Sequence, residues 1–257
     1  MQLSRDHFER PAMQAEKMGL GARQDLRRGE TLYAEDDQTQ DWFVVSSGVL
    51  RTCRYLTDGH RQVTGFYFAG DVLGFEAPIR RTSAEAVMDV TVMRYDRALL
   101  DGRHDGGLSA HSSAREMLLS ALDAAEGRIE LLGLRSACER VAGFLLRMDS
   151  PADAGHDGII VLPMVRADIA DYLALTVETV SRTLSLLGRR KLLTFFGPQR
   201  VKLLNRETLE DLAGGKPWTM SPVLATTTPL GFGARLGMAN RRASYAHGSQ
   251  PSLAEGL

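Results

Sequence analysis

The chain has 257 residues, 44% of them hydrophobic, and its formal net charge is −1. This length and composition can bury more than one core, so two domains are expected. No stretch approaches the roughly 18 apolar residues of a membrane span, and the N-terminus lacks a signal peptide's apolar core. Two widely separated cysteines, Cys53 and Cys138, fit a reducing compartment. We therefore expect a cytoplasmic protein with no membrane partner.

The N-terminal part of the chain has the pattern of an all-β domain. Residues 1–22 show no strong periodicity and are expected to form a loose arm. Over 23–108, short apolar runs such as 42–45 alternate with glycine turns at intervals of roughly ten residues. The Asp58-Gly59 pair is a strong hairpin signal. This spacing predicts a barrel or sandwich of short strands.

A long helix is predicted next, over about 112–134 within the segment 109–135. Its apolar residues step by four, three, four and three, as in a coiled-coil seam. So narrow a stripe favours a partner helix, and hence a parallel homodimer. The alternative is that the stripe covers the β domain. The seam residues are Leu118, Leu122, Ala125, Ile129 and Leu132.

A hinge is predicted where Gly133 interrupts this helix. Ser136 and Glu139 have the spacing of a capping box, so a new helix is expected to start there. It opens a second domain over 136–213. The remaining segment, 214–257, is rich in Gly, Ser, Thr and Pro without a sustained hydrophobic period, which predicts a disordered tail.

Two short amphipathic helices joined by a tight corner are predicted between residues 164 and 193. Thr176 suits the N-cap of the second helix, because its hydroxyl can accept a hydrogen bond from a backbone N–H in the next turn. On the first helix, Ile169, Ala170 and Leu173 form the apolar side, and Arg166, Asp168 and Asp171 form the polar side.

The second helix is predicted to present a hydrogen-bonding face at its start. Its apolar positions, which face the first helix, are Val177, Val180, Leu184 and Leu187. Its opposite face begins with Glu178, Thr179, Ser181 and Arg182. Arg can donate two bonds to guanine, Glu can accept from cytosine, and Ser or Thr can do either. This pattern predicts a helix-turn-helix that contacts DNA bases.

Two features favour this interpretation over an ordinary αα-hairpin with a solvated charged face. Residues 192–196 and 201–204 are predicted to be two strands around a Gly-Pro turn, which makes a wing. Between residues 161 and 206, eight Lys or Arg stand against three acids, which leaves a net charge of +5. A basic module within a neutral protein is typical of a nucleic-acid surface.

The stretch Thr-Val-Glu-Thr-Val-Ser-Arg at 176–182 resembles the recognition helix of the CRP/FNR family of bacterial transcription regulators, in its FixK-like branch. The resemblance extends from about residue 29 to residue 212. It implies an α+β fold with an N-terminal β-roll (a cyclic-nucleotide-binding-like jelly roll), a long dimerisation helix and a C-terminal winged helix-turn-helix. It also implies a homodimer that binds double-stranded DNA and, with RNA polymerase, acts mainly as an activator.

The resemblance further implies an inverted-repeat target of the form TTGAT-N4-ATCAA. Arg182 would contact the guanine, Glu178 the opposite-strand cytosine and Ser181 a neighbouring base. The residues that would contact phosphates are Thr179, Arg189, Arg190 and Lys191. The branch controls genes for low-oxygen respiration and, in rhizobia, nitrogen fixation, so we expect targets of this kind.

Residues 70–84 bear on whether the β-roll binds a cyclic nucleotide. Relatives that bind one carry Gly-Glu, a spacer and then Arg-Ser/Thr-Ala, where the Arg pairs with the phosphate. Here Glu76 follows Phe75 instead of glycine, and its spacer to Arg81 is shorter. We expect an empty pocket and no cofactor; the alternative is a cyclic-nucleotide-responsive regulator. The candidate pocket residues are Gly70, Glu76, Arg81, Thr82 and Ser83.

Other chemistries have little support in the sequence. An FNR-type iron–sulfur cluster needs about four cysteine thiolates, and residues 1–28 contain none. The six histidines are dispersed, without metal-ligand spacing, and no nucleophile elbow or phosphate loop is present. We expect no catalytic site and no metal site. Each cysteine is expected to be a small buried apolar residue rather than a redox switch.

Overall fold

A computed structural model of the protein describes residues 21–38, 41–75, 79–97, 107–149 and 159–215. These residues belong to one compact unit. Nearly all of the expected N-terminal arm and C-terminal tail, and also Glu76, lie outside the described residues, so those expectations stay predictions.

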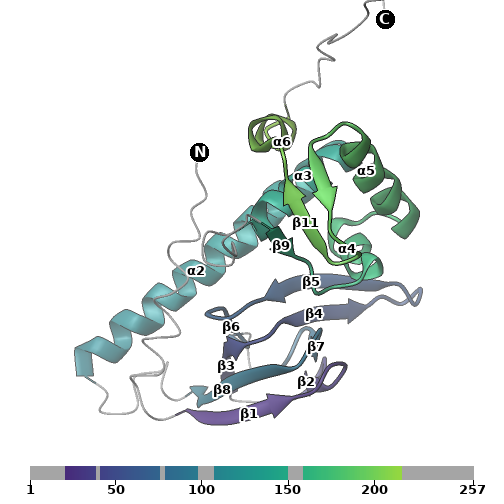
Figure 1. Cartoon of the computed structure of the whole chain (residues 1–257). Helices are drawn as coiled ribbons and strands as arrows, with labels where there is room; N and C mark the ends of the chain where they lie inside the picture. Colours follow the sequence, from purple (N-terminus) through teal and green to yellow (C-terminus); the bar gives the residue numbers. More distant parts are fainter. Residues whose placement is uncertain (1–20, 39–40, 76–78, 98–106, 150–158, 216–257) are drawn as a thin grey trace, which may run out of the picture. The chain divides into compact units, whose positions relative to one another are not determined.

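Two four-stranded antiparallel sheets form the N-terminal β-roll (Figure 1). The first sheet, in the order β1-β8-β3-β6, consists of Ala22–Leu26, Val90–Asp96, Asp41–Ser47 and Val72–Leu73. The second, in the order β2-β7-β4-β5, consists of Thr31–Tyr33, Ser83–Ala86, Leu50–Tyr55 and Arg61–Tyr67. The predicted β domain of short strands is confirmed.

Gly48 illustrates why glycines separate these strands. Its φ is +84°, and a Cβ there would lie 2.2 Å from the carbonyl oxygen of Asp89. Only glycine tolerates both the conformation and the close approach. The turn after β3 can therefore pass directly beside the start of β8. Apolar residues of the strands, such as Val45, Leu50 and Val92, are buried together in a β-roll core.

Helix α2 (Gly107–Gly133) follows the β-roll and starts earlier than the predicted residue 112. It lies against β5, where Arg128 Nη2 donates a hydrogen bond to the carbonyl oxygen of Val63 at 2.8 Å. Helix α3 (Ala137–Met148) begins at the predicted cap, where Ser136 Oγ accepts from the N–H of Glu139 at 3.2 Å. The break between the two helices therefore lies where the sequence predicted it.

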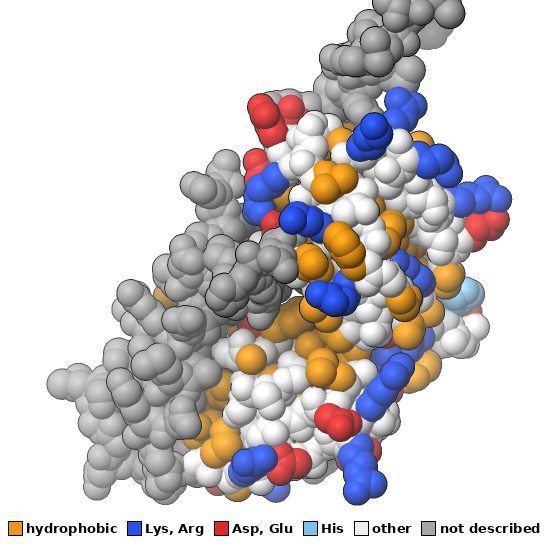
Figure 2. All heavy atoms as spheres, in the orientation of Figure 1, with side chains coloured by type: hydrophobic (Ala, Val, Ile, Leu, Met, Phe, Trp, Pro, Cys, Tyr) orange, Lys and Arg blue, Asp and Glu red, His pale blue; other side chains and the backbone are white. Residues whose placement is uncertain are grey.

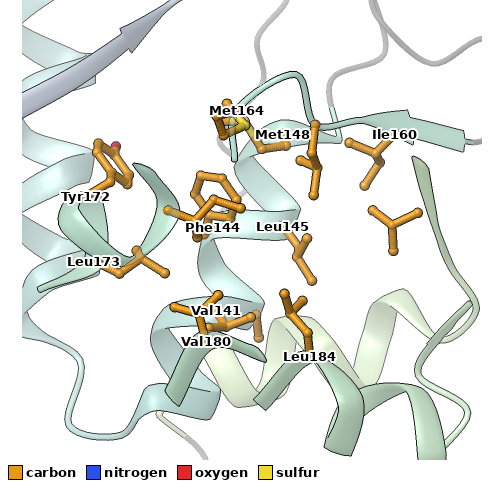
Figure 3. Close-up of a cluster of buried hydrophobic side chains, with 14 of the residues drawn as sticks. Val141, Phe144, Leu145, Met148, Ile160, Met164, Tyr172, Leu173, Val180 and Leu184 are labelled. Carbon is orange, nitrogen blue, oxygen red and sulfur yellow. The ribbon is translucent and has the colours of Figure 1, made fainter. Parts of the chain in front are cut away.

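The C-terminal part is a winged helix-turn-helix. Its remaining helices are α4 (Arg166–Leu173), α5 (Val177–Arg189) and α6 (Arg206–Ala213). Its antiparallel sheet, in the order β10-β11-β9, consists of Leu193–Phe195, Arg200–Leu203 and Ile159–Val161. Figure 3 shows the core, in which Phe144 and Leu145 of α3 meet Leu173 of α4 and Leu184 of α5. The predicted helix pair and wing are confirmed.

Two residues of the helix pair depart from the predicted faces. Asp168, assigned to the polar side of α4, is buried because partners from the β-roll cover it. Val177, assigned to the apolar side of α5, is 45% exposed, whereas Thr183 is buried. With about 3.6 residues per turn, Thr183 lies inside the buried arc of α5, and Val177 lies at the edge of that arc in the first turn.

Candidate nucleic-acid interface

Helix α5 starts at a well-defined cap. Thr176 Oγ1 accepts a hydrogen bond from the N–H of Thr179 at 3.1 Å, which confirms Thr176 as the N-cap. Ala174 closes α4 in the left-handed conformation, with φ 52° and ψ 50°. The N–H groups of Ala174 and Leu175 both donate to the carbonyl oxygen of Ala170. This tight corner fixes the direction in which α5 leaves α4.

The predicted base-contacting residues lie together on the exposed side of the first turns of α5. Arg182 Nη2 donates to Glu178 Oε1 at 2.6 Å, and the two side chains are 79% and 70% exposed. Ser181 is exposed beside them, and its carbonyl oxygen accepts from Ser185 Oγ at 2.8 Å. An exposed i,i+4 pair contributes only about 0.3–0.5 kcal/mol. The acid and the guanidinium can therefore exchange this pair for contacts to bases at little cost.

The predicted phosphate-contacting residues lie at both ends of α5. Thr179 is half-buried next to the cap, whereas Arg189, Arg190 and Lys191 are exposed at the C-terminal end. Cations there are stabilised by the negative end of the helix dipole and remain accessible to phosphates. Figure 2 shows that Lys and Arg side chains gather over the part of the molecule that carries α5 and α6.

In the β-roll, the arginine that points inward is Arg80. Its side chain is 1% exposed, and its guanidinium donates to the carbonyl oxygens of Gly74, at 2.6 Å, and Asp41. It also lies 4.4 Å from the ring centre of Tyr33. The neighbouring Arg81, which the sequence motif singled out, is exposed. Sequence alone could not tell which of two adjacent arginines turns inward.

The other described candidate pocket residues do not come together as a phosphate-binding site. Gly70 occupies a tight turn with φ +94°. Thr82 and Ser83 are half-buried, and Ser83 Oγ accepts a hydrogen bond from the N–H of Glu35 at 2.9 Å. Glu76 lies outside the described residues. With Arg80 held by carbonyl oxygens and Arg81 exposed, the described residues do not fit a cyclic phosphate in the way the motif requires.

The described His, Cys, Asp and Glu side chains form no cluster of three or more that could hold a metal ion. None of the described helices has the length and apolar character of a membrane span. Burial, followed by the charge of the Glu85 carboxylate, raises the pKa of the Cys53 thiol to about 11. Burial also raises the pKa of Cys138. Thiols with raised pKa values are poor nucleophiles at neutral pH.

Comparison with known proteins identifies the family. The sequence model of the Crp-like helix-turn-helix domain matches residues 139–212, and that of the cyclic nucleotide-binding domain matches residues 23–102. The nitrogen fixation regulation protein FixK of Azorhizobium caulinodans is 35% identical over 211 residues, which cover 80% of this chain and 84% of that protein. The chain belongs to the FixK branch of the CRP/FNR family. The family resemblance stated from the sequence is thereby confirmed.

Other FixK-branch proteins agree with this assignment. The FixK protein of Bradyrhizobium diazoefficiens is 40% identical over 173 residues, which cover 66% of this chain and 73% of that protein. The structure of FixK2 from Bradyrhizobium japonicum superimposes with a TM-score of 0.69 at 38% identity, covering 75% of this chain and 97% of that chain. In this FixK-branch chain, α5 lies within the part that matches the helix-turn-helix domain.

Proposed function

We propose that this chain is a homodimeric transcription regulator that binds the inverted repeat TTGAT-N4-ATCAA. The observation that carries the proposal is the exposed group of Glu178, Ser181 and Arg182 at the capped start of α5. In the major groove, Arg182 contacts guanine through O6 and N7, Glu178 accepts from the N4 amino group of the opposite-strand cytosine, and Ser181 contacts a neighbouring base. Residues at both ends of α5 hold phosphates, namely Thr179, Arg189, Arg190 and Lys191.

The apolar stripe of α2 supports a dimer. Leu118, Leu122 and Ile129 are 49%, 53% and 72% exposed, whereas the neighbouring Leu131 is buried in the core shared with α3. Ala125 is also exposed along this stripe, and Leu132 is half-buried. A helix that served only to cover its own β-roll would bury such a stripe. Pairing two copies of α2 covers it and places two α5 helices to contact half-sites about one DNA turn apart.

The names of the relatives suggest the target genes. Two of them, from Azorhizobium caulinodans and Bradyrhizobium diazoefficiens, are named nitrogen fixation regulation proteins. We infer that this chain regulates nitrogen-fixation or low-oxygen genes, mainly as an activator that works with RNA polymerase. Purified protein should raise transcription by RNA polymerase from a promoter that carries the repeat and not from one with a scrambled repeat.

A cyclic-nucleotide-responsive regulator is the second candidate, because the β-roll matches the cyclic nucleotide-binding domain. The positions of Arg80 and Arg81 favour regulation without this cofactor. Calorimetric titration with cyclic AMP and cyclic GMP separates the two candidates. We expect no saturable heat; binding that also raises affinity for DNA would favour the second candidate.

DNA binding is tested by fluorescence anisotropy with three duplexes at fixed moderate salt. These contain the intact repeat, one half-site with the other scrambled, and both half-sites scrambled. We expect the intact repeat to bind about 1,000-fold or more tightly than the fully scrambled duplex. The half-site duplex should lie between them, because only one α5 helix finds its bases. Equal affinity for all three duplexes at this salt concentration would contradict the proposal.

A further inference from the structure

Two arginines of the β-roll reach helix α4. Arg51 of β4 donates from Nη1 to Asp168 Oδ1 at 2.8 Å, and Arg61 of β5 donates from Nη2 to the same oxygen at 2.6 Å. Arg61 also binds Asp171 Oδ2, at 2.7 Å from Nη2 and 2.9 Å from Nε. The Asp168 side chain is only 2% exposed. Residues more than 100 positions apart thus form one partly buried ionic contact between the two domains, with Asp168 at its centre.

The ionic contact continues into the β-roll. Arg51 holds Glu85 of β7 through Nη2, at 2.7 Å, and through Nε, at 3.1 Å. Burial alone would lower the pKa of Arg61, but its hydrogen bonds to Asp171 and Asp168 outweigh this and raise the pKa. Charge-assisted bonds of this kind impose a defined geometry, and a buried charge left without its partner is strongly destabilising. The five charged groups therefore hold α4 at one place on β4 and β5.

Aromatic packing lies beside the ionic contact. The ring of Phe66 in β5 lies 5.1 Å from that of Tyr172 in α4 and 6.5 Å from that of Phe144 in α3. The guanidinium of Arg128 in α2 lies 5.1 Å from the centre of the Tyr172 ring. Apolar burial is attractive but non-directional. The guanidinium groups of Arg51 and Arg61 instead specify which face of α4 meets the β-roll.

The position of helix α4 also determines the orientation of α5. The corner at Ala174 fixes the angle between the two helices, and Leu173 of α4 is buried in the same core as Val180 and Leu184 of α5. An orientation imposed on α4 by the β-roll is therefore also imposed on the residues that face the bases.

We infer that Arg51 and Arg61 are positioning residues for DNA binding: through Asp168 and Asp171 they hold α5 at one orientation against the β-roll. In a dimer, both α5 helices then keep the separation that one spacer length requires. This inference rests on the proposed function, since it concerns the spacing of half-sites. Neither arginine needs to contact DNA.

The test compares spacer selectivity in full-length variants. Duplexes carry two intact half-sites separated by three, four, five or six base pairs, and a further duplex carries a single half-site. For R51Q/R61Q we expect about a tenfold loss of affinity at the four-base-pair spacer, a flattened preference among spacers and unchanged affinity for the single half-site. A misfolded helix-turn-helix would lose single half-site binding as well.

The matched control is R54Q. Arg54 lies on the same strand as Arg51, but its Nε pairs with Glu35 inside the β-roll at 2.9 Å. R54Q should keep the wild-type spacer preference. The variant R51Q/R61Q/D168N also removes the buried Asp168 charge, which R51Q/R61Q leaves without an arginine partner. It should show the same flattened preference, because the contact between α4 and the β-roll is still missing.

The outcomes separate the two claims. A wild-type protein that ignores the intact repeat would overturn the proposed function and, with it, this inference. If the wild type and both the double and triple variants select the four-base-pair spacer equally sharply, this inference alone is overturned.

Discussion

Arg182 and Glu178 form an ion pair across one turn of α5, with 2.6 Å between Nη2 and Oε1. The carboxylate orders a guanidinium that the rest of the helix leaves exposed. Because a bidentate Arg contact discriminates one base pair, Arg182→Ala should cost about 1–3 kcal/mol of binding free energy and relax specificity there. Competition with duplexes that each carry one substituted base pair measures the effect. An equal loss of affinity for all duplexes, with unchanged base preference, would show that Arg182 does not discriminate this base pair.

Arg190 at the C-terminal end of α5 is assigned to a phosphate. Arg190→Ala should weaken binding to all sequences alike and lower the slope of log affinity against log salt concentration by about 1. Titrations at several salt concentrations measure this slope. Arg23→Ala is a suitable control, since Arg23 is an exposed β-roll arginine paired with Asp25. An unchanged slope for Arg190→Ala would show that it contacts no phosphate.

Ile129 tests the α2 seam. Its side chain is 72% exposed in the single chain, so Ile129→Glu should leave the fold of one chain intact while placing a charge in the dimer interface. Sedimentation should show a monomer, and affinity for the intact repeat should fall toward that for a half-site. Glu130→Ala changes an exposed residue beside the stripe and should remain dimeric. A dimeric Ile129→Glu protein would place the interface elsewhere.

Ala174 carries backbone strain at the corner between α4 and α5. It is one of the few non-glycine residues with positive φ among those described. Glycine adopts this left-handed conformation without the Cβ clash, so Ala174→Gly should raise the free energy of unfolding by about 0.5–1 kcal/mol. Ala170→Gly, in the interior of α4, should instead lower it by about 1 kcal/mol. Denaturant titration of both variants gives the two signs, and a loss of stability in Ala174→Gly would contradict the account of the corner.

Cys53 should be inert in the folded protein at neutral pH. Its pKa is raised from 9.0 to about 11, chiefly by burial, so the reactive thiolate is scarce. An unfolded chain ionises this thiol near pH 9 while the folded chain does not, so stability should fall as pH rises from about 9 toward 11. Alkylation at pH 8 should be slow in buffer and fast in denaturant. Fast alkylation of Cys53 in the folded protein would show that the strand opens.

Local sequence signals predicted most of the α-helical part. The caps at Thr176 and Ser136 could be predicted because a cap depends on a residue only three positions away. The wing followed from a Gly-Pro turn between two apolar runs. The grouping of Glu178, Ser181 and Arg182 on one exposed face followed from helical periodicity alone.

Contacts between distant residues could not be predicted in this way. Asp168 has the spacing of a solvated acid, and its burial depends on ion pairs with Arg51 and Arg61, which another domain contributes. Nor does spacing decide whether Arg80 or Arg81 turns into the β-roll, because that depends on where the carbonyl oxygens of Gly74 and Asp41 lie. Both features arise from tertiary packing.

Selection of bound duplexes from a random pool by the purified full-length protein determines the preferred half-site and the spacer length together. At moderate salt, we expect enrichment of an inverted repeat with TTGAT and ATCAA half-sites separated by four base pairs. Recovery of no repeated element, or of a single unpaired half-site, would contradict a dimer that places two α5 helices in successive major grooves.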